Sequence, residues 1–298
     1  MMMRARFVLL MCLATWNALA GTADNPINLP PEAQHADYLL LGEVHDNHAG
    51  HALRLQWLKE LLATRPMALA MEQFDLDNQK ALEEALGKAG KSQQKSAPAA
   101  ELKAVAEAGG FNFRGWHWPF YEPVLALAVE QGVPLYPANL SRKNLGEILS
   151  GKQPVPSEPR EWSREQRAAL LQEVREGHCN LMPEDELPLL AGAQRARDKA
   201  MAEALIRLHR ETGKPVILLA GNGHLRKDLA VPVWLRQLDP QAKTVSVAVM
   251  ERGGSAQDHP PQTAFDAVYW VERENRPDPC EALRKRLTNS RRPGPAVP

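Results

Sequence analysis

Three short apolar runs along the chain each end abruptly in polar residues. They are Tyr38–Glu43, Met67–Glu72 and Val216–Ala220, and the last leads into Gly221 and Asn222. Short apolar runs that alternate with helical patterns are typical of buried parallel strands. We therefore predict a strand at each of these three runs.

The rest of the pattern predicts an α/β fold. Helices are expected from about residue 51, within 78–108, at 163–177 and at 187–211, and further strands at 133–139, 244–250 and 265–271. The aromatic segment 111–123 fits neither period, so it predicts a structured loop that leads into a helix near Pro123. The alternation indicates a three-layer sandwich with a mostly parallel sheet and helical insertions near 78–110 and 142–195.

The two ends of the chain differ from its middle. Residues 1–20 resemble a secretory signal peptide, with Arg4 and Arg6 before a short apolar stretch and an A-x-A site at residues 18–20. Lipid attachment at Cys12 is the disfavoured alternative, because Met11 stands where a small residue is needed. We expect a lead-in arm at 21–36, a single domain at 37–272 and a tail at 273–298.

Composition narrows the class of partner. The chain has 298 residues with 36 basic and 36 acidic side chains, and no basic stripe that would indicate a nucleic-acid partner. Beyond the signal, Cys179 and Cys280 could pair in an oxidising compartment or stay as two free thiols. Sequence alone does not place them within bonding distance, so both alternatives stay open.

Acidic and imidazole side chains follow the predicted strands. Glu43, His45, Glu72 and His224 would meet where the carboxyl ends of parallel strands form one edge of the sheet. Carboxylates with imidazoles suit a divalent metal ion or acid/base chemistry. These four residues are therefore the candidate metal ligands and, if the protein is an enzyme, the candidate catalytic residues.

A glycine-flanked turn follows the third run. Residues 221–227 could present backbone N–H groups to an anion, with Arg226 and Lys227 adding positive charge. The alternative is a tight turn with a basic pair on the surface. The chain has no G-x-S-x-G elbow and no C-x-x-C-H haem attachment site, which disfavours serine hydrolases and covalent haem.

Several of these segments together resemble one known family. The chain is similar to the ChaN-type haem-binding uptake proteins, which share a superfamily with the Tiki and TraB proteins and the erythromycin esterases. The resemblance covers roughly residues 37–250. The matching segments are Leu41–Asn47 with His51 and Gln56, Met71-Glu72, Trp118–Pro123, Asn139–Arg142, Ala193–Ala202 and Gly221–Pro232.

The resemblance implies a function and a place in the cell. It implies an EreA/ChaN-like fold and a secreted bacterial protein of an iron and haem uptake system, periplasmic or, if lipidated, attached to the outer membrane. Haem b would be held non-covalently between two protomers, with a tyrosine on the iron. An outer-membrane haem receptor is then a candidate partner.

The chain offers few candidates for that axial ligand. Of its four tyrosines, Tyr121 lies in the aromatic segment, where a flat macrocycle could stack on neighbouring rings. The alternative is that Tyr121 belongs to an ordinary aromatic cluster. His178 is a second candidate, although a histidine at a helix end often caps helix carbonyls instead. The rival function is a metal-dependent or acid/base hydrolase of esters or peptides that uses the Glu/His cluster.

Overall fold

One parallel sheet forms the centre of the computed structural model, which describes residues 28–90, 97–160, 162–253 and 260–290. The strand order is β3-β2-β4-β1-β5-β6, and every neighbouring pair is parallel. The strands are β1 (Tyr38–Glu43), β2 (Ala68–Asp75), β3 (Leu135–Asn139), β4 (Val216–Gly221), β5 (Thr244–Glu251) and β6 (Ala267–Val271). The predicted signal peptide and most of the predicted lead-in arm lie outside the described residues.

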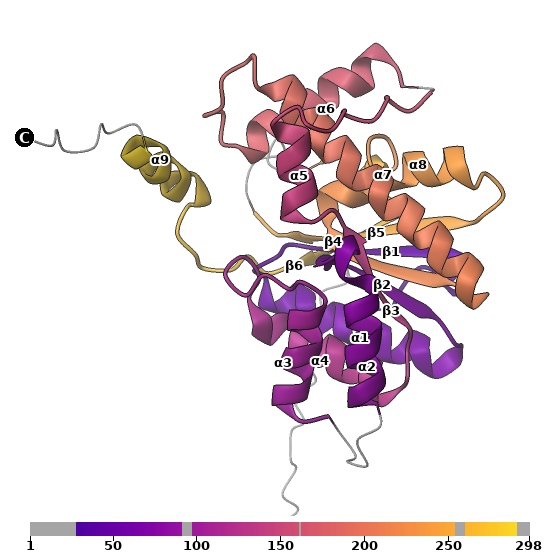
Figure 1. The fold of residues 1–298 in the computed structure, drawn as a ribbon. Helices are drawn as coiled ribbons and strands as arrows, with labels where there is room; N and C mark the ends of the chain where they lie inside the picture. Colours follow the sequence, from indigo (N-terminus) through magenta and orange to yellow (C-terminus); the bar gives the residue numbers. More distant parts are fainter. Residues whose placement is uncertain (1–27, 91–96, 161, 254–259, 291–298) are drawn as a thin grey trace, which may run out of the picture.

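Helices cover both faces of the sheet, as Figure 1 shows. On one side lie α1 (His48–Thr64), α2 (Gln79–Ala89), α3 (Ala99–Ala108) and α4 (Trp118–Glu130). On the other lie α5 (Arg142–Leu149), α6 (Arg164–Gly177), α7 (Leu187–Thr212) and α8 (Val231–Leu238). The predicted three-layer α/β sandwich is confirmed, and its sheet is parallel throughout.

Strand β1 shows why the sheet is buried on both faces. Leu39 and Leu41 pack in the core with Trp57 of α1, whereas Tyr38 and Leu40 pack in a second core on the opposite face. All four side chains are fully buried. Consecutive residues of a strand face opposite sides, so an unbroken apolar run is what a doubly covered strand requires.

Three elements differ from the sequence-based expectations. Helix α4 begins at Trp118 rather than near Pro123, because Pro119 lies in its first turn, where a missing N–H costs nothing. Strand β2 continues past Glu72 to Asp75, and the expected tail contains helix α9 (Pro279–Ser290). No helix among the described residues is both long and apolar enough to cross a membrane.

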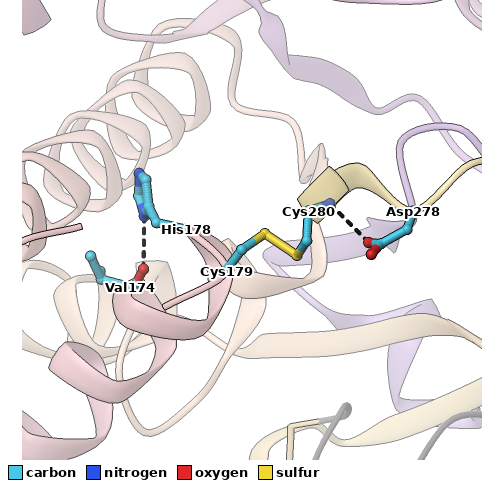
Figure 2. The surroundings of a disulfide bond; sticks show 5 residues. All are labelled: Val174, His178, Cys179, Asp278 and Cys280. Atoms are coloured by element: carbon cyan, nitrogen blue, oxygen red, sulfur yellow. Dashed lines mark hydrogen bonds between the residues drawn. A yellow bond between two sulfur atoms is a disulfide. The ribbon is translucent and has the colours of Figure 1, made fainter. Parts of the chain in front are cut away.

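A disulfide ties the C-terminal segment to the body of the protein (Figure 2). Cys179, just after α6, is bonded to Cys280 at the start of α9, so the alternative of two free thiols is ruled out in this structure. Residues 272–276, before this cross-link, run beside the loop that follows β1. Arg276 forms ion pairs with Asp46 and with Glu251 there.

Candidate functional site

The predicted Glu/His cluster lies at the carboxyl edge of the sheet, but it is divided between the two faces. Glu43 lies on the same face of β1 as Leu41, and this face packs against α1 and α4. Glu72 lies on the same face of β2 as Ala70, which is the opposite face of the sheet, and its side chain is directed toward α7. The period of two along each strand causes this division. The single crevice expected from the sequence is therefore two networks, one on each face.

The first network surrounds the Glu43 carboxylate. Tyr121 of α4 donates its hydroxyl to Glu43 Oε1 over 2.6 Å, and Gln73 Nε2 donates to the same oxygen over 3.2 Å. His45 Nδ1 lies 2.7 Å from Oε1, and the Arg54 guanidinium forms an ion pair with Oε2. Both Glu43 and Arg54 are almost completely buried. The buried Glu43 carboxylate is thus contacted by polar side chains on both of its oxygens.

The charges in this network decide its protonation. Burial acts to raise the pKa of Glu43, but the charge of Arg54 and the hydrogen bond with His45 outweigh it and lower the pKa to about 2. Burial and the charge of Arg54 together lower the pKa of His51 to about 4. At neutral pH Glu43 is therefore a carboxylate, and His51 is a neutral imidazole.

The second network surrounds Glu72. Arg197 Nη2 donates to Glu72 Oε1 over 2.5 Å, and the backbone N–H of Gly221 donates to Oε2 over 2.7 Å. His224 Nε2 lies 3.4 Å from Oε1, while its Nδ1 lies 2.5 Å from Asp198 Oδ1. Helix α7 thus supplies two charged partners: Arg197 for the Glu72 carboxylate and Asp198 for the His224 imidazole.

Charge pairing again overcomes burial at this second network. Burial acts to lower the pKa of His224, but the charges of Glu72 and Asp198 raise it to about 9. Burial acts to raise the pKa of Glu72, and the charges of His224 and Arg197 hold it well below its usual value. The pair therefore exists as a carboxylate beside an imidazolium at neutral pH.

His45 connects the two networks across the edge of the sheet. Its Nδ1 side is held by Glu43, and its ring lies against Gly221 of the neighbouring strand. A Cβ atom at position 221 would lie 2.7 Å from His45 Cε1 and 2.9 Å from Nε2, so a side chain there would displace the ring. Unlike the buried carboxylates, the His45 side chain is 46% exposed.

Five side chains with rings lie together on the surface near this edge, and we call them the aromatic rim. They are His45, His48, Trp116, His117 and Phe120. The rings of His45 and Trp116 meet edge to face, with centroids 4.6 Å apart. Phe120 lies 6.0 Å from the ring of His48 and 4.6 Å from that of His117. Three imidazoles in the rim are exposed, and Trp116 and Phe120 are half-buried.

The hydroxyl group of every tyrosine in the chain is hydrogen-bonded to another residue of the protein. Tyr121, the first candidate for the axial ligand, is fully buried, and burial together with the charge of Glu43 raises the pKa of its phenol. Each of the four phenol oxygens donates a hydrogen bond to an acceptor. The pairs are Tyr38 with Asp239, Tyr121 with Glu43, Tyr136 with Glu211 and Tyr269 with the carbonyl of Asn28.

The other predicted ligand-binding residues lie apart from the rim or are paired. His178 follows α6 and its Nδ1 contacts the carbonyl of Val174 over 2.7 Å, which is the capping alternative (Figure 2). Arg226 is buried between Glu173 and Asp228. Lys227 is paired with Asp266. The turn after β4 therefore carries a basic pair whose charges are already balanced.

The metal prediction has no direct support in the arrangement. Within the described ranges, no group of three or more histidine, cysteine, aspartate or glutamate side chains is placed to hold a metal ion. Glu43 and Glu72 instead bind arginines. A metal at this cluster stays a prediction.

Several members of the two networks were not assigned to the site from the sequence. Arg54 follows His51 by three positions on α1, and Gln194, Arg197 and Asp198 share one face of α7 at spacings of three and four. Gln194 Nε2 lies 3.2 Å from His224 Nδ1. Polar residues that recur at helical spacing on a face packed against a sheet are the signal that could have identified them.

The charge on His224 predicts a loss of stability in alkali. Because its pKa is about 9 in the folded protein against 6.5 as the ordinary value, its contribution is complete below about pH 6.5 and disappears as the pH rises through 9. Urea unfolding from pH 6.5 to 9.5 should therefore show falling stability, with a flatter profile for His224→Gln. Equal alkaline slopes in both proteins would contradict this assignment.

Comparison with known proteins places this site in context. The family profile described as haem-binding uptake, Tiki superfamily, ChaN matches residues 29–235. The solved structure of ChaN of Campylobacter jejuni, described as binding haem cofacially, has a TM-score of 0.65 at 24% identity. That match covers 80% of this chain and 88% of the other. A search among curated proteins finds no match.

More distant likenesses are also found. The erythromycin esterase EreC, in a mutant form, has a TM-score of 0.42 at 15% identity, with 73% of this chain and 71% of that chain covered. The type III effector HopBA1 has a TM-score of 0.43 at 13% identity, with 81% and 90% covered. Likenesses at this level decide nothing about function. The profile spans most of the sheet and both networks, and this chain belongs to the ChaN family of haem-binding uptake proteins.

Proposed function

We propose that this protein is a secreted bacterial haem-binding protein of an iron and haem uptake system, and that it holds haem b non-covalently between two protomers. The observation that carries the proposal is the family match over residues 29–235, which includes β1, the aromatic rim and the turn after β4. The C. jejuni protein with this fold is described as binding haem cofacially, which supports the two-protomer arrangement.

The residues at the carboxyl edge suit a haem. An imidazole is an established axial ligand for haem iron, and the aromatic rim offers three exposed imidazoles beside Trp116 and Phe120. Half-buried aromatic rings provide apolar surface for a planar macrocycle. When bound, the haem would supply the iron that such a system delivers. An imidazole of the rim would hold this iron, and the aromatic rings would shield the macrocycle from water.

Two features support secretion. The first 20 residues have the composition of a signal peptide, with a positive start, a short apolar stretch and an A-x-A site. The Cys179–Cys280 disulfide suits an oxidising compartment such as the periplasm. An outer-membrane haem receptor is the partner that would supply haem there.

Sedimentation velocity followed at the Soret wavelength tests binding and assembly together. The purified protein with hemin should carry Soret absorbance at the sedimentation coefficient of a dimer, whereas the protein alone should sediment as a monomer. Absorbance that sediments as free hemin would overturn haem binding. Absorbance on a monomer at all protein concentrations would overturn the two-protomer arrangement but keep haem binding.

A further inference from the structure

A segment near the end of the described chain runs beside the loop that follows β1. Residues 272–280, which we call the strap, begin where β6 ends and are fixed at the other end by the bond from Cys280 to Cys179 (Figure 2). We propose that the strap is a redox-sensitive device. The disulfide keeps the strap against the loop after β1 and the start of α1, and reduction of the disulfide releases it from both.

The strap supplies hydrogen-bond partners to the start of helix α1. The N-cap residue Asn47 is fully buried, and its Nδ2 donates to the carbonyl of Glu272 over 2.8 Å. The backbone N–H of His48 donates to Glu274 Oε1 over 2.9 Å. The first N–H groups of a helix have no partner within the helix itself, so a side chain from elsewhere must provide one. Glu274 of the strap has this role.

The carboxylate of Glu251, at the end of β5, joins the strap to the same loop. Its Oε1 accepts from Asn47 Nδ2 over 2.7 Å and from Arg276 Nη1 over 2.8 Å, and its Oε2 accepts from Arg276 Nη2 over 2.5 Å. Burial acts to raise the pKa of Glu251, but the hydrogen bonds with Arg276 and Asn47 lower it. Arg276 also pairs with Asp46. Departure of the strap would therefore remove partners from both ends of the loop.

The composition of the strap makes these contacts depend on its two fixed ends. Residues 272–278 are Glu-Arg-Glu-Asn-Arg-Pro-Asp, so no aliphatic or aromatic side chain anchors them in the core. Glu274 and Arg276 are half-buried, and the others are exposed. Polar contacts near the surface each add little net stability. Opening the disulfide frees one end of the strap and returns chain entropy that the closed loop had lost.

The backbone at Cys179 indicates that this position is not adapted to the turn alone. The N–H of Cys179 donates to the carbonyl of Glu176 and that of Asn180 to the carbonyl of Arg175, which is a Schellman end to α6. Cys179 and Asn180 have left-handed φ values of 60° and 55°. Glycine usually occupies the position of Cys179, because this conformation is unfavourable for residues with a Cβ atom. A cysteine kept there points to a function of its sulfur.

The reaction that would release the strap is thiol–disulfide exchange with a protein dithiol. Cys179 and Cys280 are both partly exposed, so a reductant can approach the bond. A thiolate of the dithiol would attack one sulfur and form a mixed disulfide, and its second thiol would then displace the protein. Two electrons and two protons pass to the protein. Cys179 and Cys280 become thiols, and the reductant becomes a disulfide.

Release of the strap has a consequence for haem. The loop after β1 and the start of α1 carry His45 and His48 of the aromatic rim. This step rests on the proposed haem-binding function. A rim that must first be ordered binds its ligand more weakly than one that is already fixed. The oxidised protein should therefore retain haem, and reduction should promote its release.

Amide hydrogen exchange of His48, followed by NMR, tests the device without haem. Glu274→Ala removes the acceptor of this N–H while the disulfide stays intact, and should accelerate the exchange by about 10-fold. The double variant Cys179→Ser with Cys280→Ser should accelerate it as strongly. Adding Glu274→Ala to the double variant should then change nothing, because the strap has already left. Wild-type protein reduced with dithiothreitol provides the same comparison without the cysteine substitutions.

This absence of additivity separates release of the strap from a general loss of stability. If Glu274→Ala accelerates the exchange of His48 equally with and without the disulfide, the strap stays in place after reduction and the proposal is overturned. Glu281→Ala is the matched control, since Glu281 lies on α9 and pairs with Lys285. It should leave the exchange of His48 unchanged in both backgrounds.

A hemin titration tests the consequence for haem. The double variant Cys179→Ser with Cys280→Ser should bind hemin more weakly than the oxidised wild type, by about 5-fold or more, as is typical of coupled sites. Equal affinities would overturn the control of haem by the strap. If neither protein binds hemin, the proposed function fails, whereas the exchange of His48 still decides whether the strap responds to reduction.

Discussion

Arg54→Met is expected to lower the free energy of unfolding by about 3–5 kcal/mol, because it leaves the buried Glu43 carboxylate without its arginine. Arg54 and Glu43 are both almost completely shielded from water, and the guanidinium is the strongest influence that keeps the Glu43 pKa near 2. Without it, the pKa of Glu43 should rise, since burial then acts with less opposition. Urea unfolding at pH 7 measures the loss.

The double variant Arg54→Met with Glu43→Gln provides the control. It removes both charges, and buried ion pairs replaced together by neutral groups often cost little. Two nitrogens of Arg54, Nε and Nη1, have no hydrogen-bond partner among the described residues, so methionine also removes unsatisfied polar atoms. The double variant should recover most of the lost stability. If it is no more stable than Arg54→Met, the pairing of charges does not explain the loss.

Reduction of the disulfide should also destabilise the protein strongly. Cys179 and Cys280 are 101 positions apart in sequence, and closing a loop of that length in the unfolded chain is worth up to about 5 kcal/mol in the chain-entropy model. The midpoint of urea unfolding should therefore fall when dithiothreitol is added.

The double variant Cys179→Ser with Cys280→Ser is the matched comparison. Its unfolding midpoint should equal that of the reduced protein and should not respond to dithiothreitol. Residues 272–276, which precede the cross-link, also contact the loop that follows β1, where Arg276 pairs with Asp46. Equal stability of the oxidised and reduced proteins would show that the cross-link constrains only the end of the chain.

The strands were predictable from the sequence because each is buried on both faces. A doubly covered strand needs an unbroken apolar run; β1 has the bounds that its run indicates, and β4 ends one residue beyond its run, at Gly221. The start of α4 was harder to predict, since its first turn contains Trp118 and Phe120 on an aromatic segment without helical periodicity.

The partners of the site residues were less predictable for a physical reason. The ends of the apolar runs locate Glu43 and Glu72 at one edge of the sheet, but the alternation along each strand directs their side chains to opposite faces. The packing of the helices on each face then determines which charged residues pair with them. Arg54 and Arg197 come from helices on those opposite faces. Their pairing depends on how α1 and α7 dock against the sheet, which no local pattern specifies.

The strand order has a consequence for how the protein folds. Strand β4 lies between β1 and β2, so these early strands gain their shared neighbour only after the chain has continued to residue 216. Glu72 and the Gly221 N–H that binds it are 149 positions apart. Contacts at such separation form late, because the chain entropy must be lost before they stabilise the fold. A nascent chain therefore lacks the complete edge until the segment that begins with β4 has docked, and the part of the protein where we propose that haem binds is among the last to form.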